Sequence, residues 1–235
     1  MLSNNLLALA ITFTLALAWL RLNDFAAQRG WVASALSRKI IHMGTGPLFV
    51  VCWLLFSQVT SARYLAALVP LLITLQFLLV GLGVIKDEAA VQAMSRTGDR
   101  REILRGPLFY GIVFILVTLI YWTDTPIGIV ALMLMCGGDG LADIFGRYYR
   151  GSRLPWNQAK SWRGSLGMFF GGWLFSTIIL VVYITLGVFP LTFQTIVAPI
   201  TVIAVAGTVV ESLPLPDVDN LTVTATALAL GLLFF

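Results

Sequence analysis

The sequence reads Gly138-Asp139-Gly140-Leu141-Ala142-Asp143-Ile144-Phe145-Gly146-Arg147 where a long apolar segment ends. Asp139, Asp143 and Arg147 are each four residues apart, so on a helix they share one face. Charged groups are costly near a bilayer core, and several of them together need a structural or functional reason. The stretch therefore predicts a membrane helix with a polar site at its end.

The composition indicates a membrane protein. Of 235 residues, 59% are hydrophobic and 11% are charged, whereas soluble domains carry about 25% charged residues. Apolar spans of roughly twenty residues can cross a bilayer, and we expect them at 4–22, 39–57, 63–85, 106–123, 126–148, 163–188, 191–212 and 219–235. We therefore predict an all-α polytopic membrane protein, a bundle of seven to eight transmembrane helices that forms a single domain over residues 1–235.

The distribution of positive charge predicts the topology. Fourteen of the 15 lysine and arginine residues lie in alternate connections between these spans, and only Arg63 lies in the others. The positive-inside rule then places the basic connections in the cytoplasm and the N-terminus outside. These residues flank membrane spans, so we expect membrane lipids as partners and no nucleic acid.

Asp139 and Asp143 are candidate metal ligands. Two carboxylates one helical turn apart repel each other unless a divalent cation lies beside them, and oxygen ligands favour magnesium or manganese. Glycines 137, 138, 140 and 146 would let a bulky ligand approach the backbone there. The alternative is a salt-bridged helix end, in which Asp143 pairs with Arg147 and the glycines serve helix packing.

A second cluster, Lys160-Ser161-x-x-Gly164-Ser165, stands where the span at 163–188 begins. Free backbone N–H groups, a lysine and two hydroxyls would meet there, which predicts a phosphate site. The pattern is not a P-loop. Alternatively, Lys160 is a topology signal and Ser161 a helix cap.

A third cluster, Arg38-Lys39-x-x-His42, opens the span at 39–57. Arg38 and His42 share a helix face, so Arg38 and Lys39 could bind phosphate while His42 accepts a proton or donates a hydrogen bond. A lone histidine near a helix end also commonly serves as a structural hydrogen bonder, and this alternative stays open.

The fourth cluster is the acidic connection from Glu211 to Asn220, which also holds Asp217 and Asp219. Three carboxylates without a cation among them would be balanced by the basic residues of the other connections or by a metal ion. Asp219 or Asn220 is expected to cap the last helix. The alternative is a proline-rigid acidic turn.

In this order, the four clusters resemble the motifs of the polyprenol kinase family, the CTP-dependent membrane kinases of lipid alcohols. The carrying motifs are Arg38-Lys39-x-x-His42, Asp139-Gly140-x-Ala142-Asp143-x-x-Gly146-Arg147, Lys160-Ser161-x-x-Gly164-Ser165, and Glu211-Ser212-x-Pro214 with Asp219-Asn220. The run from Ser95 to Tyr110 and the short chain resemble the phytol kinase branch of the family.

The resemblance implies transfer of the terminal phosphoryl group of a nucleoside triphosphate, CTP by family habit, to the hydroxyl of phytol or a related isoprenoid alcohol. It implies magnesium or manganese at Asp139 and Asp143, and a bacterial plasma or thylakoid membrane, as in cyanobacteria, with the site on the cytoplasmic face. The oligomeric state stays open. The implied catalytic residues are Asp139, Asp143, Lys160 and His42, and the implied nucleotide-binding residues are Arg38, Lys39, Arg147, Lys160, Ser161, Gly164, Ser165, Glu211, Asp219 and Asn220.

Two other classes are weighed against this one. CDP-alcohol phosphotransferases share an Asp-Gly-x-x-Ala start, but they require further aspartates at a fixed spacing, and after Asp143 no aspartate follows before Asp217. A transporter would place its charges near the bilayer midplane, whereas these lie at the ends of predicted helices.

Overall fold

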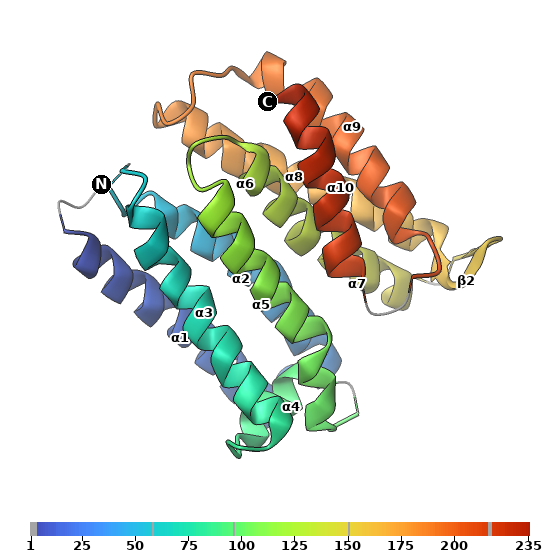
Figure 1. Ribbon diagram of the computed structural model, residues 1–235. Helices are drawn as coiled ribbons and strands as arrows, with labels where there is room; N and C mark the ends of the chain where they lie inside the picture. Colours follow the sequence, from blue (N-terminus) through green and yellow to red (C-terminus); the bar gives the residue numbers. More distant parts are fainter. Residues whose placement is uncertain (1–3, 58, 96, 150, 216–217) are drawn as a thin grey trace. The chain divides into compact units, whose positions relative to one another are not determined.

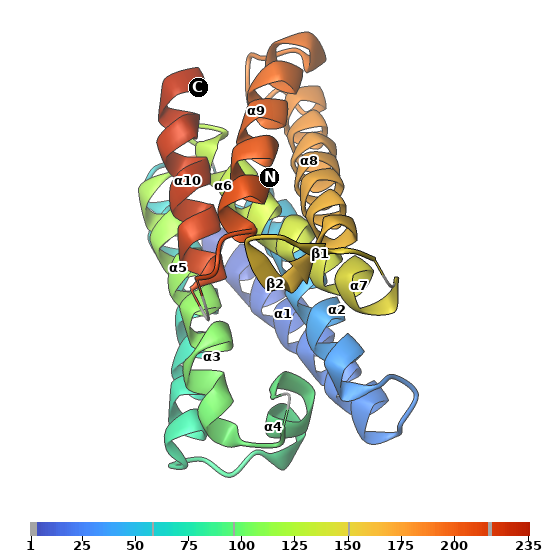
Figure 2. The ribbon, with the colours of Figure 1, turned by 90° about the vertical axis from the view of Figure 1, so that its right-hand side faces the viewer.

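The computed structural model describes residues 4–57, 59–95, 97–149, 151–215 and 218–235, and nearly all of its regular structure is helical. The chain forms two compact units, Met1–Ile120 and Tyr121–Phe235. Their helices can be followed by colour in Figures 1 and 2. The prediction of an all-α polytopic membrane protein is confirmed, whereas the prediction of a single domain over 1–235 stays a prediction.

The first unit contains three long helices and several shorter elements (Figure 1). In chain order they are α1 (Asn5–Gln28), α2 (Ser34–Trp53), α3 (Ala62–Leu82), α4 (Glu88–Met94), the 3₁₀ helix η1 (Arg100–Leu104) and α5 (Gly106–Ile120). Asp87 starts α4, because its side chain accepts a hydrogen bond from the backbone N–H of Ala90 at 3.0 Å. Such a cap satisfies a donor that the first helical turn leaves without a partner.

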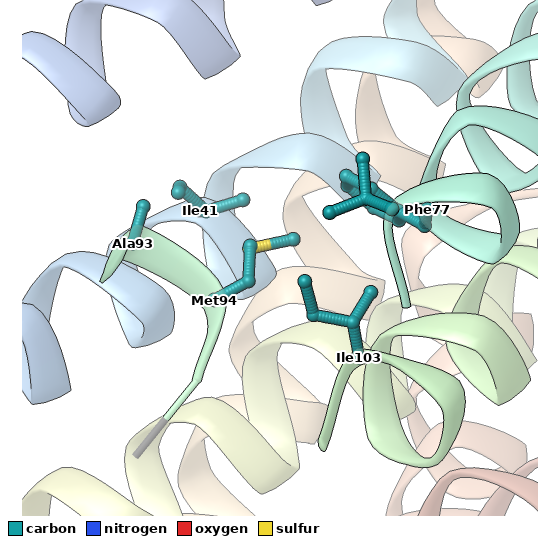
Figure 3. Packing of buried hydrophobic residues seen from close by; sticks show 6 residues of the cluster. Ile41, Phe77, Ala93, Met94 and Ile103 are labelled. Carbon is teal, nitrogen blue, oxygen red and sulfur yellow. The ribbon is translucent and has the colours of Figure 1, made fainter. Parts of the chain in front are cut away.

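Buried apolar side chains attach α4 and η1 to the ends of the long helices. Figure 3 shows Met94 of α4 and Ile103 of η1 beside Ile41 of α2 and Phe77 of α3. Ile103 is completely buried and Ile41 nearly so. The connection between α3 and α5 is therefore folded onto the helices rather than extended from them.

The second unit begins with one helical span, Ile127–Tyr148, that is regular at both ends and widened in the middle. It consists of α6 (Ile127–Met133), the π-helix η2 (Leu134–Asp139) and α7 (Gly140–Tyr148). The hairpin β1 (Arg153–Leu154) and β2 (Asn157–Ser161) follows, then α8 (Trp162–Thr185), α9 (Phe193–Glu211) and α10 (Asp219–Phe234). A π-turn inside an α-helix is rare and is frequently found at functional sites. Here it ends at Asp139.

Glycines allow the widened span to pack closely against α8. A Cβ atom at Gly167 would lie 2.6 Å from the carbonyl oxygen of Leu141, and one at Gly171 would collide with the carbonyl of Gly137. Small residues at such positions let two membrane helices approach backbone to backbone. At Gly137 the structure thus shows helix packing, the alternative that the sequence left open.

The described helices match most of the predicted spans. Six of them are long and apolar enough to cross a membrane, and α10 is a shorter apolar helix. The predicted span at 39–57 overlaps α2 (Ser34–Trp53), which is not one of these six helices. The sequence analysis did not predict the hairpin between α7 and α8.

Candidate functional site: a lysine among three carboxylates

Three carboxylates from separate parts of the second unit meet, one from the middle of the span Ile127–Tyr148 and two from the ends of α9 and α10. Asp139 ends η2, Glu211 ends α9 and Asp219 begins α10. One carboxylate oxygen of each lies within 4.8 Å of those of the other two. The π-turn and the short connection between α9 and α10 therefore assemble a concentrated negative charge.

Lys160, at the end of β2, points into this group of carboxylates. Its Nζ donates hydrogen bonds to Glu211 Oε1 and to Asp219 Oδ2, the latter at 3.0 Å. Burial alone would lower the pKa of Lys160, but the charges of Glu211 and Asp219, with a contribution from Asp139, outweigh it and raise the pKa above its usual value. Lys160 is therefore held as a cation while it contacts these carboxylates.

The hairpin positions Lys160 at the end of α9. Its strands pair antiparallel, with Arg153 opposite Ser161 and Leu154 opposite Asn157. Figure 2 shows the hairpin beside α7, next to the adjoining ends of α8, α9 and α10. A two-residue turn reverses the chain, so the lysine returns toward the start of α8.

Asn157 fixes the hairpin to the end of α9. Only 9% of this residue is exposed, and its side-chain amide donates to the carbonyl oxygens of Ser212 at 3.1 Å and Leu213 at 3.2 Å. Its own Oδ1 accepts from the backbone N–H of Ala159 at 3.1 Å. Trp156 adds a hydrogen bond from its indole N–H to the hydroxyl of Ser212 at 3.2 Å. Asn157 lies three residues before Lys160, so its hydrogen bonds hold this strand to the segment that follows Glu211.

Glu211 carries a buried oxygen that the described part of the chain leaves without a hydrogen bond. The residue is only 4% exposed, and its Oε2 atom has no partner there, although Oε1 accepts from Lys160. A buried polar atom without a partner destabilises a protein, so it calls for an explanation. Three carboxylates with a spare buried oxygen match the oxygen ligands that magnesium and manganese prefer.

The start of α8 is already occupied by hydrogen bonds within the chain. The Ser161 side chain accepts from the backbone N–H of Gly164 at 3.1 Å, and the N–H of Trp162 donates to the carbonyl of Ser152 at 3.2 Å. The Ser165 hydroxyl is buried and has no partner within the described residues. Ser161 is therefore a helix cap, and fewer amides are open to a phosphate than the motif suggested.

Asp143 is engaged elsewhere on the same helix as Asp139. Its Oδ1 accepts from Arg147 Nε at 2.8 Å, an ion pair across one turn of α7. The structure thus shows the salt-bridged helix end that the sequence analysis named as the alternative. It brings Asp139 together with Glu211 and Asp219, a combination that sequence spacing did not reveal. A metal bound by Asp139 and Asp143 stays a prediction.

The remaining predicted site residues belong to the first unit or lie beside those already described. Arg38, Lys39 and His42 are on α2, where the His42 ring packs on that of Tyr110 with centroids 4.5 Å apart. The Tyr110 hydroxyl donates to the His42 carbonyl at 2.7 Å. Their predicted roles stay predictions.

Asn220 is the second residue of α10, next to Asp219. Asp217, which the sequence analysis also named, lies outside the described residues.

Asn157 and Trp156 are the contributors to the site that sequence reasoning assigned no role. Their hydrogen bonds reach across 55 and 56 positions of the chain, so no local periodicity reports them. Burial does not alternate along β2, so the sequence held no strand pattern here, and its only local signal was the turn-forming Pro155.

The helices and this group of charges define a polytopic all-α membrane protein in which a lysine and three carboxylates converge. Relatives specify it further. The chain is 42% identical over 222 residues to a probable chloroplastic phytol kinase of Triticum aestivum, which covers 94% of this chain and 74% of that protein. It is 45% identical over 222 residues to probable phytol kinase 1 of Oryza sativa subsp. japonica, covering 93% and 71%.

Phytol kinase 1 of Arabidopsis thaliana is 40% identical over 210 residues, covering 88% of this chain and 69% of the relative. The chain belongs to the phytol kinase family. This confirms the resemblance drawn from the four sequence clusters. No protein-family model and no solved structure matches the chain.

These relatives correct one expectation. All three are named chloroplastic. This finding contradicts the expected localisation in a bacterial plasma or thylakoid membrane with the site on the cytoplasmic face. Charge asymmetry between loops reports which side of a membrane a loop occupies, and it holds no information on which membrane that is.

Proposed function

We propose that this protein is a lipid-alcohol kinase that transfers the terminal phosphate of a nucleoside triphosphate to the hydroxyl of phytol or a related isoprenoid alcohol, giving phytyl phosphate. The names of its relatives support the acceptor, and the family resemblance supports CTP as the donor. The observation that carries the proposal is the convergence of Lys160 with Asp139, Glu211 and Asp219.

Phosphoryl transfer requires little covalent chemistry from the protein. It needs a metal ion, cations that stabilise the phosphate oxygens, and in-line positioning of the two substrates. The buried Oε2 of Glu211, which has no hydrogen-bond partner among the described residues, and the all-oxygen donor set fit a divalent ion. Asp139, Glu211 and Asp219 would hold magnesium or manganese, which would neutralise charge on the triphosphate.

Lys160 supplies the fixed positive charge for the triphosphate. As a cation, Lys160 can attract the oxygens of the triphosphate. The site includes the ends of the apolar helices α9 and α10, where an alcohol with a long hydrocarbon tail can approach through the bilayer.

The test is a labelling assay on the purified full chain in detergent. The protein is offered CTP or ATP labelled at the γ position, with phytol, farnesol or geranylgeraniol as the acceptor. We expect γ-label in a lipid phosphate with CTP and phytol, dependent on magnesium or manganese. CTP labelled at the α position is the control, because a CDP-alcohol type transferase would place α-label in the lipid. No γ-label in any lipid with either nucleotide would refute the proposal.

A further inference from the structure

Lys160 occupies the position that a divalent cation would need. Its Nζ lies within hydrogen-bond reach of two of the three carboxylates, and the ligand oxygens of all three are within 4.8 Å of one another. Magnesium binds carboxylate oxygens at about 2.1 Å. An ammonium group and a divalent ion cannot share so small a volume, because like charges at this distance repel strongly.

The lysine does not satisfy the carboxylates completely. It bonds to Glu211 Oε1 and Asp219, and the buried Glu211 Oε2 has no hydrogen-bond partner in the described part of the chain. A purely structural ion pair of this kind would be expected to satisfy its buried oxygens. Lys160 is therefore the counter-ion of Glu211 Oε1, but it leaves Glu211 Oε2 without a hydrogen bond in the described part of the chain.

Two of the amides that could bind a triphosphate at the start of α8 are already engaged. The amides of Trp162 and Gly164 at the start of α8 already donate within the chain. Lys160 has a flexible stem, and its side chain is 26% exposed. Release from the carboxylates would let the ammonium group turn toward a phosphate.

We propose that Lys160 is the counter-ion of these carboxylates until a divalent cation and the nucleotide bind. The cation then binds the carboxylates, and the lysine side chain moves to the phosphate. This rests on the proposed function for the identity of the phosphate ligand only. It predicts that a free divalent cation binds weakly to the wild-type chain, because it must displace an ammonium group from two carboxylates.

The first experiment measures binding of Mn²⁺ alone to the purified full chain by electron paramagnetic resonance, with neither nucleotide nor alcohol present. Lys160→Gln should bind Mn²⁺ at least about tenfold more tightly than the wild type, a difference in binding free energy of about 1.4 kcal/mol. Arg163→Gln is the matched control. It removes a positive charge from an exposed side chain three residues away, where screening by water and salt should limit the change to about twofold. Lys160→Arg should bind weakly, as the wild type does.

The second experiment needs no variant and so does not depend on the folding of Lys160→Gln. Reductive methylation of the wild-type chain, read by mass spectrometry, reports how accessible each lysine amine is. Adding Mg²⁺ should speed methylation of Lys160 at least about threefold, because the cation displaces it from the carboxylates. Lys86, which is exposed in the connection after α3, should be unaffected.

The proposal and the proposed function fail in different ways. Equal Mn²⁺ affinity in the wild type and Lys160→Gln, or no Mn²⁺ binding by either, overturns the counter-ion role. So does a Lys160 methylation rate that Mg²⁺ leaves unchanged. If both experiments give the expected result while the labelling assay shows no phosphate transfer, the exchange of lysine for cation holds and the kinase proposal is wrong.

Discussion

Lys160 Nζ lies 3.0 Å from Asp219 Oδ2, although the two residues are 59 positions apart in the chain. The contact joins the end of a hairpin to the first residue of the last helix. Both ends are anchored independently, the hairpin by Asn157 and the helix by its own backbone hydrogen bonds. The contact is therefore fixed by the fold of the second unit and does not result from free movement of a surface lysine.

The carboxylates should differ in their importance for catalysis. Asp139→Asn and Glu211→Gln should each reduce kcat at least about a hundredfold, on the order of 2.7 kcal/mol, because each removes a proposed metal ligand. Asp143→Asn should cost less than about tenfold, since Asp143 is paired with Arg147. Excess chelator should abolish turnover. If Asp143→Asn proves as damaging as Asp139→Asn, the metal is held by the pair on one helix face instead.

Removing the charge of Lys160 should affect the nucleotide and spare the alcohol. Lys160→Ala should raise the KM for nucleotide or lower kcat, because a fixed cation for the phosphate is lost. The KM for phytol should change by less than about threefold, under roughly 0.7 kcal/mol. Steady-state kinetics with each substrate varied in turn separates the two effects. A loss of phytol affinity with normal nucleotide kinetics would contradict the role of Lys160 at phosphate.

Asn157 should act as a positioning residue. Asn157→Ala leaves two backbone carbonyls without their donor and should lower the free energy of unfolding by about 1–3 kcal/mol. Asn157→Asp should not rescue it, because a carboxylate cannot donate to those carbonyls. The control is Gln158→Ala. Gln158 is exposed, and among the described residues its side chain donates to the carbonyl of Leu154 within the hairpin, so about 0.5 kcal/mol or less is expected.

The readout that separates positioning from mere stability is kinetic. In Asn157→Ala protein that is still folded, the KM for nucleotide should rise while the KM for phytol stays unchanged, because Lys160 is no longer held against Glu211. Equal changes in both constants would assign Asn157 a purely structural role. Thermal unfolding in detergent and kinetics on the same preparations supply both measurements.

The close packing of α7 on α8 predicts opposite effects for two glycines. Gly167→Ala should destabilise the protein by about 1–3 kcal/mol, because its Cβ would lie 2.6 Å from the Leu141 carbonyl oxygen and the helices would have to separate. Gly146→Ala has its closest neighbour at an ordinary 3.6 Å, the Ser161 Oγ. It should be neutral or stabilising by up to about 1 kcal/mol, the usual gain of alanine over glycine in a helix. Thermal unfolding of both variants checks the contrast.

The sequence by itself determined the class of fold, the approximate helices and the family. The reason is physical: apolar runs of bilayer length and helical spacing are local properties, and both are encoded by residues close together in the chain. The pairing of Asp143 with Arg147 is of this kind, since four residues on a helix make one turn. The sequence analysis named that pairing as an alternative.

The tertiary structure decided which charged groups meet. Glu211 contacts Lys160 across 51 positions, and Asp139 joins them from a different helix. That convergence depends on three features without a local signature: the π-turn ending at Asp139, the hairpin held by Asn157, and the glycine contacts that bring α8 against α7. Contacts between distant segments follow from the packing of whole helices. Residue spacing therefore indicated which residues belong to the site but not which of them contact one another.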